Sequence, residues 1–267
     1  MTRYRASEVE LRMSGSGVPV MLLHGIGGAA ESFEPQLTGL AERHRVIAWD
    51  APGYGGSADL PGHPVLDAYA EAVVHLLEEL EDPPAHLVGV SWGGVIATRV
   101  ALKAPDLLRS LVLAGSTRGS GRTAEAAAAM AARVDELAAK GPGAFAAVRG
   151  PGLLGSGADP VVAENVVSLM SRVRLQGYRN AARVMAATDH STHLSGITVP
   201  ALVLVGSEDR VTGVGESRFL ARQIPGAQLV ELTGAGHAAN QEAPDAFNAA
   251  LLRFFAEVDD RGGHGDG

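Results

Sequence analysis

A serine flanked by glycines is the residue of this chain best suited to nucleophilic chemistry. Gly89-Val90-Ser91-Trp92-Gly93 is the only G-x-S-x-G among the 267 residues, although 34 glycines make a chance match conceivable. It stands between an apolar strand-like segment (residues 86–90) and an apolar helix-forming segment (residues 92–103). A serine on such a sharp strand-to-helix turn is strained, and the flanking glycines remove side chains that would collide. Its hydroxyl would lie at a helix N-terminus, whose free N–H groups favour developing negative charge.

Other chemistry-bearing residues do not form a recognisable metal or cofactor motif. The chain has no cysteine, which excludes disulfides, thiolate zinc sites, iron–sulfur clusters and a cysteine nucleophile. His190 and His193 have no third clustered ligand, so we interpret them as the end of a helix. The glycine-rich segments lack the spacing of a P-loop or of a dinucleotide-binding loop. The sequence therefore predicts neither a metal nor an organic cofactor.

Short apolar β-branched segments alternate with longer helix-period segments, a pattern typical of βαβ units around a mostly parallel sheet. The expected fold class is α/β, a doubly wound and mostly parallel sheet. Strands are predicted at residues 9–13 (a half-exposed edge strand), 18–23, 45–49, 86–90, 110–114, 201–205 and 228–232. Helices are predicted at residues 35–43, 65–80, 92–103, 216–223 and 244–257.

One segment, residues 117–195, interrupts this alternation. It contains helical stretches split by Gly-Pro-Gly at residues 141–143 and 150–152, and it is too long to be a plain loop. We expect a helical cap that covers one edge of the sheet, with an alanine-rich surface helix near residues 124–133. The α/β core then comprises residues 1–116 and 196–258. The Gly/Asp-rich end, residues 259–267, is expected to be disordered.

Three motifs together resemble those of α/β-hydrolase-fold serine hydrolases. Besides the G-x-S-x-G segment, the loop His24-Gly25-Ile26-Gly27-Gly28 is similar to the family's HG-x-G loop, and residues 50–57 (DAPGYGGS) are close to its D-x-P-G-x-G-x-S turn. The resemblance runs from about residue 9 to residue 258. It is strongest to small cofactor-free esterases and lactonases of the 3-oxoadipate enol-lactonase type. It implies the α/β-hydrolase fold, with the insertion as its cap.

The resemblance also implies a base and an acid for Ser91. The family places its histidine between the last strand and the last helix, in a similar G-H…E-x-P pattern, which corresponds to His237 here. Asp209 follows the predicted strand at residues 201–205 and gives the family's order of serine, acid and base. Some members take the acid from the preceding strand, but residues 114–117 (AGST) contain none. Glu208 is the competing carboxylate, and we expect it to solvate the surface.

An anionic tetrahedral intermediate needs hydrogen-bond donors that are already in place. The resemblance assigns this role to the backbone N–H groups of Trp92 and Ile26, with Gly27 as the alternative to Ile26. Because these donors are main-chain N–H groups, the side-chain types at these positions neither support nor oppose the assignment.

The net charge and the distribution of apolar residues narrow the kind of molecule that the chain is expected to bind. The chain carries 22 Lys and Arg against 30 Asp and Glu, a formal charge of −8, which disfavours binding to nucleic acid or to an anionic membrane. Its polar start resembles no signal peptide, and no apolar run approaches the length of a membrane span. We therefore expect a cytoplasmic protein with a small-molecule ester or lactone as its partner; the oligomeric state is left open.

Two other functions remain open from the sequence. A carbon–carbon bond hydrolase of the meta-cleavage-product type shares the fold, although the tryptophan that those enzymes often carry after the base is Ala238 here. A non-hydrolytic sensor or cyclase is the second, although such proteins often lose triad members that are present in this chain. Residues 117–195 carry nine Lys and Arg against six Asp and Glu, so a basic cap could attract a carboxylate-bearing substrate, while ordinary solvated helix faces would explain the same charges.

Overall fold

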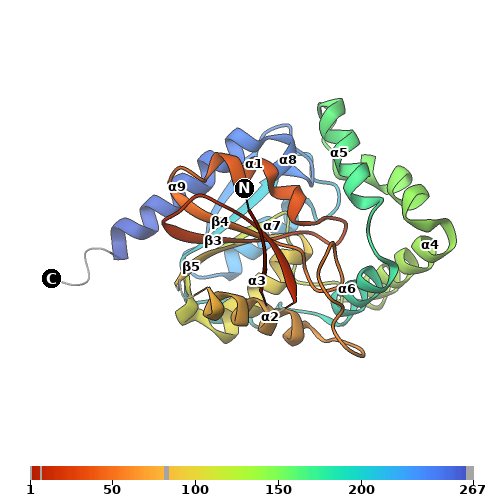
Figure 1. The fold of residues 1–267 in the computed structure, drawn as a ribbon, viewed down its shortest axis with the longest axis horizontal. Helices are drawn as coiled ribbons and strands as arrows, with labels where there is room; N and C mark the ends of the chain where they lie inside the picture. Colours follow the sequence, from red (N-terminus) through yellow and green to blue (C-terminus); the bar gives the residue numbers. More distant parts are fainter. Residues whose placement is uncertain (1, 7, 81–83, 263–267) are drawn as a thin grey trace.

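The described part of the computed structural model, residues 2–6, 8–80 and 84–262, contains an eight-stranded sheet with helices on both faces (Figure 1). The spatial order is β1-β2-β4-β3-β5-β6-β7-β8; β1, β2 and β4 are antiparallel neighbours, and every pair from β4 to β8 is parallel. The strands are β1 (Thr2–Ala6), β2 (Val9–Ser14), β3 (Val18–Leu23), β4 (His44–Trp49), β5 (Ala85–Val90), β6 (Leu108–Ala114), β7 (Ala201–Gly206) and β8 (Gln228–Leu232). The predicted fold class, a doubly wound and mostly parallel sheet, is confirmed.

Two hydrophobic clusters, one on each face, hold the helices to the sheet. One contains α1 (Glu34–Gly39) and α9 (Pro244–Gly262), and the other contains α2 (Leu66–Glu79), α3 (Trp92–Lys103) and α7 (Gly213–Gln223). Strand β3 shows why both clusters form: Val20 and Leu22 point into the first, and Met21 and Leu23 into the second. The sequence of a strand buried on both faces is therefore continuously apolar.

The long segment between β6 and β7 is helical, and residues 115–200, all of which the structure describes, contain no strand. Its helices α4, η3, α5 and α6, which we call the cap helices, lie together beyond one end of the sheet (green, right side of Figure 1). Their bounds are α4 (Ala124–Arg149), η3 (Gly150–Leu153), α5 (Pro160–Met170) and α6 (Leu175–Ala187). Helix α4 is kinked where Gly141, at φ 74°, precedes Pro142. Short helices complete the fold: η1 (Ala30–Phe33), η2 (Pro105–Leu107), η4 (Leu194–Gly196) and α8 (Ala239–Glu242).

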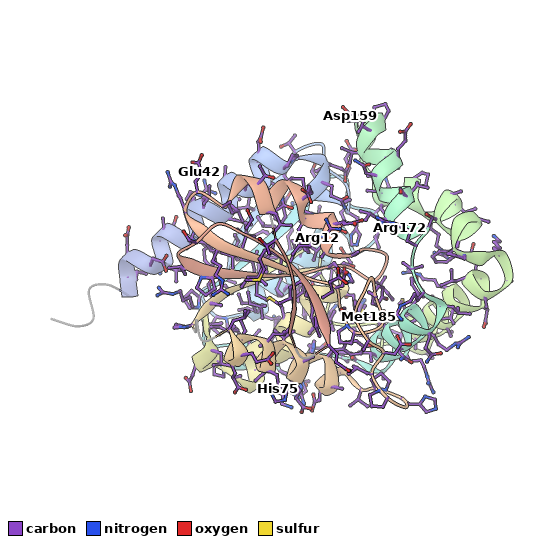
Figure 2. The ribbon with its side chains drawn as sticks, viewed as in Figure 1. Arg12, Glu42, His75, Asp159, Arg172 and Met185 are labelled. Carbon is purple, nitrogen blue, oxygen red and sulfur yellow. The ribbon has the colours of Figure 1, made fainter. Side chains whose placement is uncertain are left out.

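Arginines fasten the cap helices to the core. Glu31 of η1 pairs with Arg12 of β2 and also with Arg172, which follows α5 (Figure 2). Arg174 donates to the carbonyl oxygens of Gly53 (3.1 Å) and Ser57 (2.6 Å). The Arg172–Glu31 pair is largely exposed on its arginine side and stabilises the fold only slightly, so the contacts of Arg172 and Arg174 serve mainly to fix where the cap helices lie.

Strand β1 and helix α1 differ from the sequence-based expectations. Strand β1 was not predicted, because its sequence, TRYRA, has no apolar pattern and it pairs only with β2 at the sheet edge. Helix α1 ends at Gly39, earlier than predicted, because the chain must turn there to begin β4 at His44.

Among the described residues, no helix is long and apolar enough to cross a membrane.

The prediction that residues 259–267 are disordered is wrong for residues 259–262. Helix α9 continues through residues 259–262, because Asp259 accepts a hydrogen bond from Arg109 Nη1 (2.8 Å) and lies 3.5 Å from His86 Nε2. These contacts hold the end of α9 against the amino ends of β5 and β6. Residues 263–267 lie outside the described residues.

His86 is a buried, uncharged histidine at the start of β5. Its ring stacks on Phe255 of α9 with 4.0 Å between ring centroids, and its Nδ1 lies 2.8 Å from Ser110 Oγ. Burial lowers the pKa of His86 to about 4, although the charge of Asp259 opposes that shift. Because the folded-state pKa lies below the ordinary value of 6.5, the unfolded chain binds more protons between pH 6.5 and 4. Folding stability is therefore lost as the pH falls through this interval.

We predict that replacing His86 flattens the pH dependence of stability. Between pH 6.5 and 5 the free energy of unfolding of the wild type should fall by on the order of 2 kcal/mol more than that of His86→Gln. His75→Gln is the matched control, because the His75 side chain is 68% exposed on the surface of α2 (Figure 2). Urea unfolding at both pH values measures the difference. Equal pH dependence in His86→Gln and the wild type would contradict this account.

Candidate active site

Ser91 occupies a strained turn between β5 and α3. Its φ of 53° and ψ of −116° are unusual for a residue with a side chain, and among the described non-glycine residues only Glu8 shares a positive φ. The turn is held on both sides, because the Ser91 N–H donates to Ala114 O (2.8 Å) and its carbonyl accepts from Ser116 Oγ (3.0 Å). In the described part of the chain, the Ser91 hydroxyl has no hydrogen-bond partner.

The glycines on either side of Ser91 allow the turn to close. A Cβ on Gly93 would lie 2.1 Å from the carbonyl oxygen of Leu23, and one on Gly89 would lie 2.4 Å from that of Gly93. Both distances are far below van der Waals contact, and both involve backbone atoms that cannot move aside. The G-x-S-x-G pattern is thus required by the close approach of β5, α3 and the end of β3.

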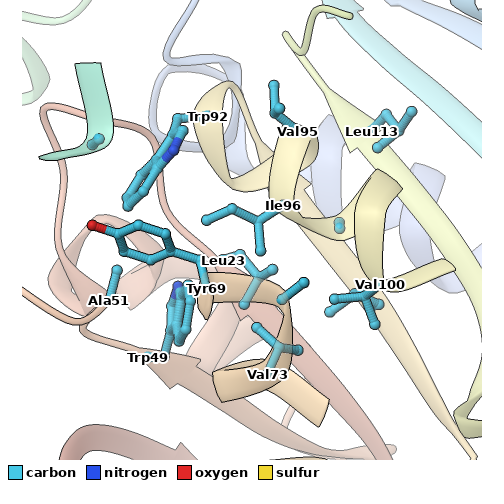
Figure 3. Packing of buried hydrophobic residues seen from close by; sticks show 14 of the residues in the cluster. Leu23, Trp49, Ala51, Tyr69, Val73, Trp92, Val95, Ile96, Val100 and Leu113 are labelled. Atoms are coloured by element: carbon cyan, nitrogen blue, oxygen red, sulfur yellow. The ribbon is translucent and has the colours of Figure 1, made fainter. Parts of the chain in front are cut away.

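Trp92 anchors the first turn of α3 beside the serine. Its ring is fully buried and packs against Tyr69, with ring centroids 5.1 Å apart at an interplanar angle of 79° (Figure 3). Tyr54 packs against the same ring at 5.4 Å. The edge-to-face contact with Tyr69 and the tilted contact with Tyr54 add to the burial of a large aromatic surface. The helix start is therefore rigid, and the backbone N–H groups at its N-terminus keep a fixed direction.

The structure brings His237 and Asp209 together, although 28 residues separate them. His237 Nδ1 lies 2.9 Å from Asp209 Oδ2, and the Asp209 side chain is fully buried. Gly115, at the end of β6, passes so close that a Cβ there would lie 3.2 Å from His237 Nδ1. The absence of a side chain at this position, noted in the sequence only as the absence of an acid, makes room for the pair.

The surroundings of Asp209 stabilise the ionised form of its side chain. Its Oδ1 accepts from the N–H groups of Val211 (2.8 Å) and Thr212 (3.1 Å), and its Oδ2 accepts from Thr212 Oγ1 (2.8 Å). Burial by itself would raise the pKa of Asp209, but the hydrogen bond and charge of His237, together with these donors, lower it to about 2. Thr212 was missed in the sequence; the D-x-x-T spacing, which suits a carboxylate that binds the following turn, was the available signal.

Glu208, the competing carboxylate, faces the cap instead. It accepts from the N–H and the hydroxyl of Ser156 at 2.7 and 3.1 Å. The expectation that it only solvates the surface is incomplete, because these bonds link the end of β7 to the segment between η3 and α5.

The loop that carries His237 is bound to the same segment. The His237 N–H donates to Leu153 O (2.7 Å), and the Glu242 carboxylate accepts from the N–H groups of Gly236 (3.0 Å) and Gly155 (2.7 Å). The sequence offered Glu242 only as part of a motif, without this role. The cap helices therefore help to set the position of the imidazole.

Ser91 and His237 open into one cavity of about 470 Å³ between the strand ends and the cap helices. Ile26 and Gly27 line the same cavity. The backbone N–H groups of Ile26, Gly27 and Trp92 have no acceptor among the described residues. A Cβ on Gly25 would lie only 3.2 Å from Ser91 Cβ, so this loop approaches the serine closely. The site thus combines a free hydroxyl, an imidazole paired with a carboxylate, and uncommitted N–H donors.

Two other histidines have structural partners. His24 Nε2 accepts from the N–H of Ala51 (3.0 Å), and burial lowers the pKa of His24. His190 Nε2 lies 3.2 Å from Val95 O, and burial lowers its pKa to about 4. No group of three or more histidine, cysteine or carboxylate side chains in the described part of the chain is placed to hold a metal ion.

Sheet topology and the strand-to-helix serine turn together define the α/β-hydrolase class of enzyme. The chain matches the model of the "Alpha/beta hydrolase family" over residues 20–250, and it belongs to this family.

Several relatives of this chain are named as hydrolases. The chain is 30% identical to a putative carbamate hydrolase RutD from Azorhizobium caulinodans, over 95% of this chain and 97% of the relative. It is 28% identical to 3-oxoadipate enol-lactonase 2 from Acinetobacter baylyi, over 85% of each chain. Among solved structures, a thermophilic esterase from Thermogutta terrifontis has a TM-score of 0.88 at 29% identity, covering 97% of this chain and 99% of that one. The enol-lactonase from Burkholderia xenovorans has a TM-score of 0.85 at 26% identity, with coverage of 96% and 100%. This chain is therefore a hydrolase of the same broad class.

We predict that Gly93→Ala destabilises the fold by at least about 2 kcal/mol, because the new methyl group meets backbone atoms of β3. Gly143→Ala is the control, since a Cβ there meets nothing within 4 Å and the residue lies in α4. It should leave the stability unchanged or raise it by up to about 1 kcal/mol. Urea unfolding measures both variants, and a Gly93→Ala protein as stable as the wild type would refute the steric argument.

Proposed function

We propose that this protein is a cofactor-free serine hydrolase that cleaves a carboxylic ester or lactone through an acyl-enzyme, with Ser91, His237 and Asp209 as its catalytic triad. The observation that carries the proposal is the pairing of His237 with buried Asp209 at a cavity that the strained Ser91 also lines. A surface histidine or a structural serine would not require this combination of strain, burial and pairing.

In the first half of the reaction, His237 Nε2 takes the proton of Ser91 as its oxygen attacks the substrate carbonyl. Asp209, ionised above a pKa of about 2, holds the His237 Nδ1 proton and stabilises the imidazolium. The N–H groups of Trp92 and Ile26 donate to the oxyanion of the tetrahedral intermediate. His237 then returns the proton to the leaving alkoxide, and the acyl group remains on Ser91.

In the second half of the reaction, a water molecule occupies the place that the alcohol has left beside the acyl-enzyme. His237 removes a proton from the water as it attacks the acyl-enzyme, the same N–H groups bind the second oxyanion, and Ser91 leaves with the proton that His237 returns. For a lactone the leaving alkoxide stays attached to the acyl group, so one hydroxy acid is released. No step of this cycle needs a metal or an organic cofactor.

Relatives support an acyl substrate without fixing which one. Two are named for a carbamate and for an enol-lactone, and a solved neighbour is named an esterase. These reactions share attack on a carbonyl with an oxygen or nitrogen leaving group. Ala238 follows the base at the position where carbon–carbon bond hydrolases of the meta-cleavage-product type often carry a tryptophan. We therefore place carbon–carbon bond cleavage second.

We predict that Ser91→Ala lowers kcat/KM for p-nitrophenyl acetate by at least roughly 10⁴-fold while the protein remains folded. Ser168→Ala is the control, because Ser168 is exposed on α5 and does not line the cavity. Ester hydrolysis is followed spectrophotometrically, and circular dichroism checks the fold. Wild-type activity in Ser91→Ala would show that the nucleophile is a different group.

A vinylogous 1,5-diketone tested beside the ester separates the two reaction types. We expect the ester to have the higher kcat/KM in the wild type. Turnover of the diketone alone would replace the proposal with carbon–carbon bond hydrolysis.

A further inference from the structure

The charged residues of the cavity wall come from a single cap helix. Arg133, Glu136 and Arg149 of α4 line the cavity, and no other Asp, Glu, Lys or Arg does so among the described residues. Much of the surrounding wall is apolar, with Phe145 and Met170 among its members. A substrate that fills this space therefore meets apolar side chains and one charged region.

Two of these three charges neutralise each other. Arg149 donates through Nε (2.8 Å) and Nη2 (2.6 Å) to Glu136 Oε2, and Lys140 Nζ lies 3.0 Å from Glu136 Oε1. The Arg149 guanidinium also lies 5.3 Å from the centre of the Phe145 ring. Glu136 is thus committed to two cations, and Arg149 is held in place by two hydrogen bonds to one oxygen of that carboxylate.

Arg133 is the cavity cation that remains uncompensated. Among the described residues it has no carboxylate partner within ion-pair distance, and its neighbour is the hydroxyl of Tyr178 on α6. Burial raises the pKa of Tyr178, against the opposing charges of Arg133 and Arg149, so the hydroxyl stays protonated and can donate a hydrogen bond. A partly buried guanidinium without a counter-ion is an unfavourable arrangement that an anionic ligand would relieve.

The net charge of the cap segment does not by itself select the ligand. Residues 117–195 carry a net charge of +3 while the whole chain carries −8, but several of these cations pair with carboxylates of the core, as Arg118 does with Glu216 and Arg172 with Glu31. The local charge of Arg133 in the cavity wall therefore carries the argument for an anionic ligand.

We propose that Arg133, assisted by the Tyr178 hydroxyl, binds a carboxylate of the substrate, so that the preferred substrates are esters or lactones bearing a free carboxylate on an apolar chain. This inference rests on the proposed function for the identity of the scissile bond. The planar fork of the guanidinium suits a carboxylate, and the apolar side chains that line the same cavity suit a methylene chain.

The test compares a charged substrate with its neutral partner. Monomethyl and dimethyl esters of straight-chain C4 to C8 diacids differ only in the free carboxylate. We expect the wild type to prefer the monomethyl ester of at least one chain length, and Arg133→Met to lower the ratio of the two kcat/KM values at least tenfold. Arg133→Lys should retain part of the preference, since it keeps the charge and loses the fork.

Arg183→Met is the matched control, because Arg183 is an exposed arginine of α6 outside the cavity and its loss changes the net charge equally. It should keep the wild-type ratio. An equal loss in Arg183→Met would show that the general field, rather than contact with Arg133, sets the preference. No preference in the wild type, or an unchanged ratio in Arg133→Met, would overturn the proposal.

Calorimetry on a protein without the nucleophile separates this inference from the proposed function. Each monomethyl ester of the C4 to C8 diacids is titrated, and at least one should bind Ser91→Ala with a Kd at least tenfold lower than that for Ser91→Ala/Arg133→Met. If the wild type hydrolyses neither ester but this difference holds, the proposed reaction fails and the carboxylate site stands. Equal affinities of the two proteins for every ester of the series would reject the carboxylate site even if esters are hydrolysed.

Discussion

The backbone conformation of Ser91 is the constraint on which the rest of the site depends. A residue with a side chain at φ 53° is destabilised by about 1–3 kcal/mol and persists only when its surroundings leave no alternative. Here the parallel pairing of β5 with β3 and β6 fixes the approach to Ser91, and the buried ring of Trp92 fixes the departure. Because neither side can yield, the hydroxyl remains directed at the cavity rather than into the sheet.

The base is held by a different set of contacts, and these join the core to the cap helices. Asp209 and Thr212 come from the end of β7, whereas the backbone of His237 is bound by Leu153 and its loop by Glu242. The cap helices therefore do more than cover the cavity. Because the His237 N–H donates to Leu153 O, a change in η3 would be transmitted directly to the position of the imidazole.

Much of the fold could be predicted from the sequence, because buried parallel strands must be apolar and β5 and α3 flank a motif with strict steric demands. Strand β1 could not, since an edge strand of the sequence TRYRA has no hydrophobic period. The continuation of α9 beyond residue 258 depends on Arg109 and His86, which lie far away in the sequence.

The candidate site also has residues that could be predicted from the sequence and contacts that could not. Ser91 and the approximate positions of His237 and Asp209 follow from motif order and from the rule that strand ends meet at one edge of the sheet. The links from Glu208 to Ser156 and from Glu242 to Gly155 are contacts between distant segments with no local pattern. Which charges of α4 face the cavity likewise depends on the kink at Gly141 and on the packing of α6.

Covalent labelling tests the central claim, that the strained serine is an activated nucleophile. The wild-type protein is treated with a fluorophosphonate, and the adduct is located by mass spectrometry of its peptides. The account predicts one adduct, on Ser91, and much slower labelling in His237→Ala. An unlabelled protein, or an adduct on another serine at the same rate in both proteins, would contradict it.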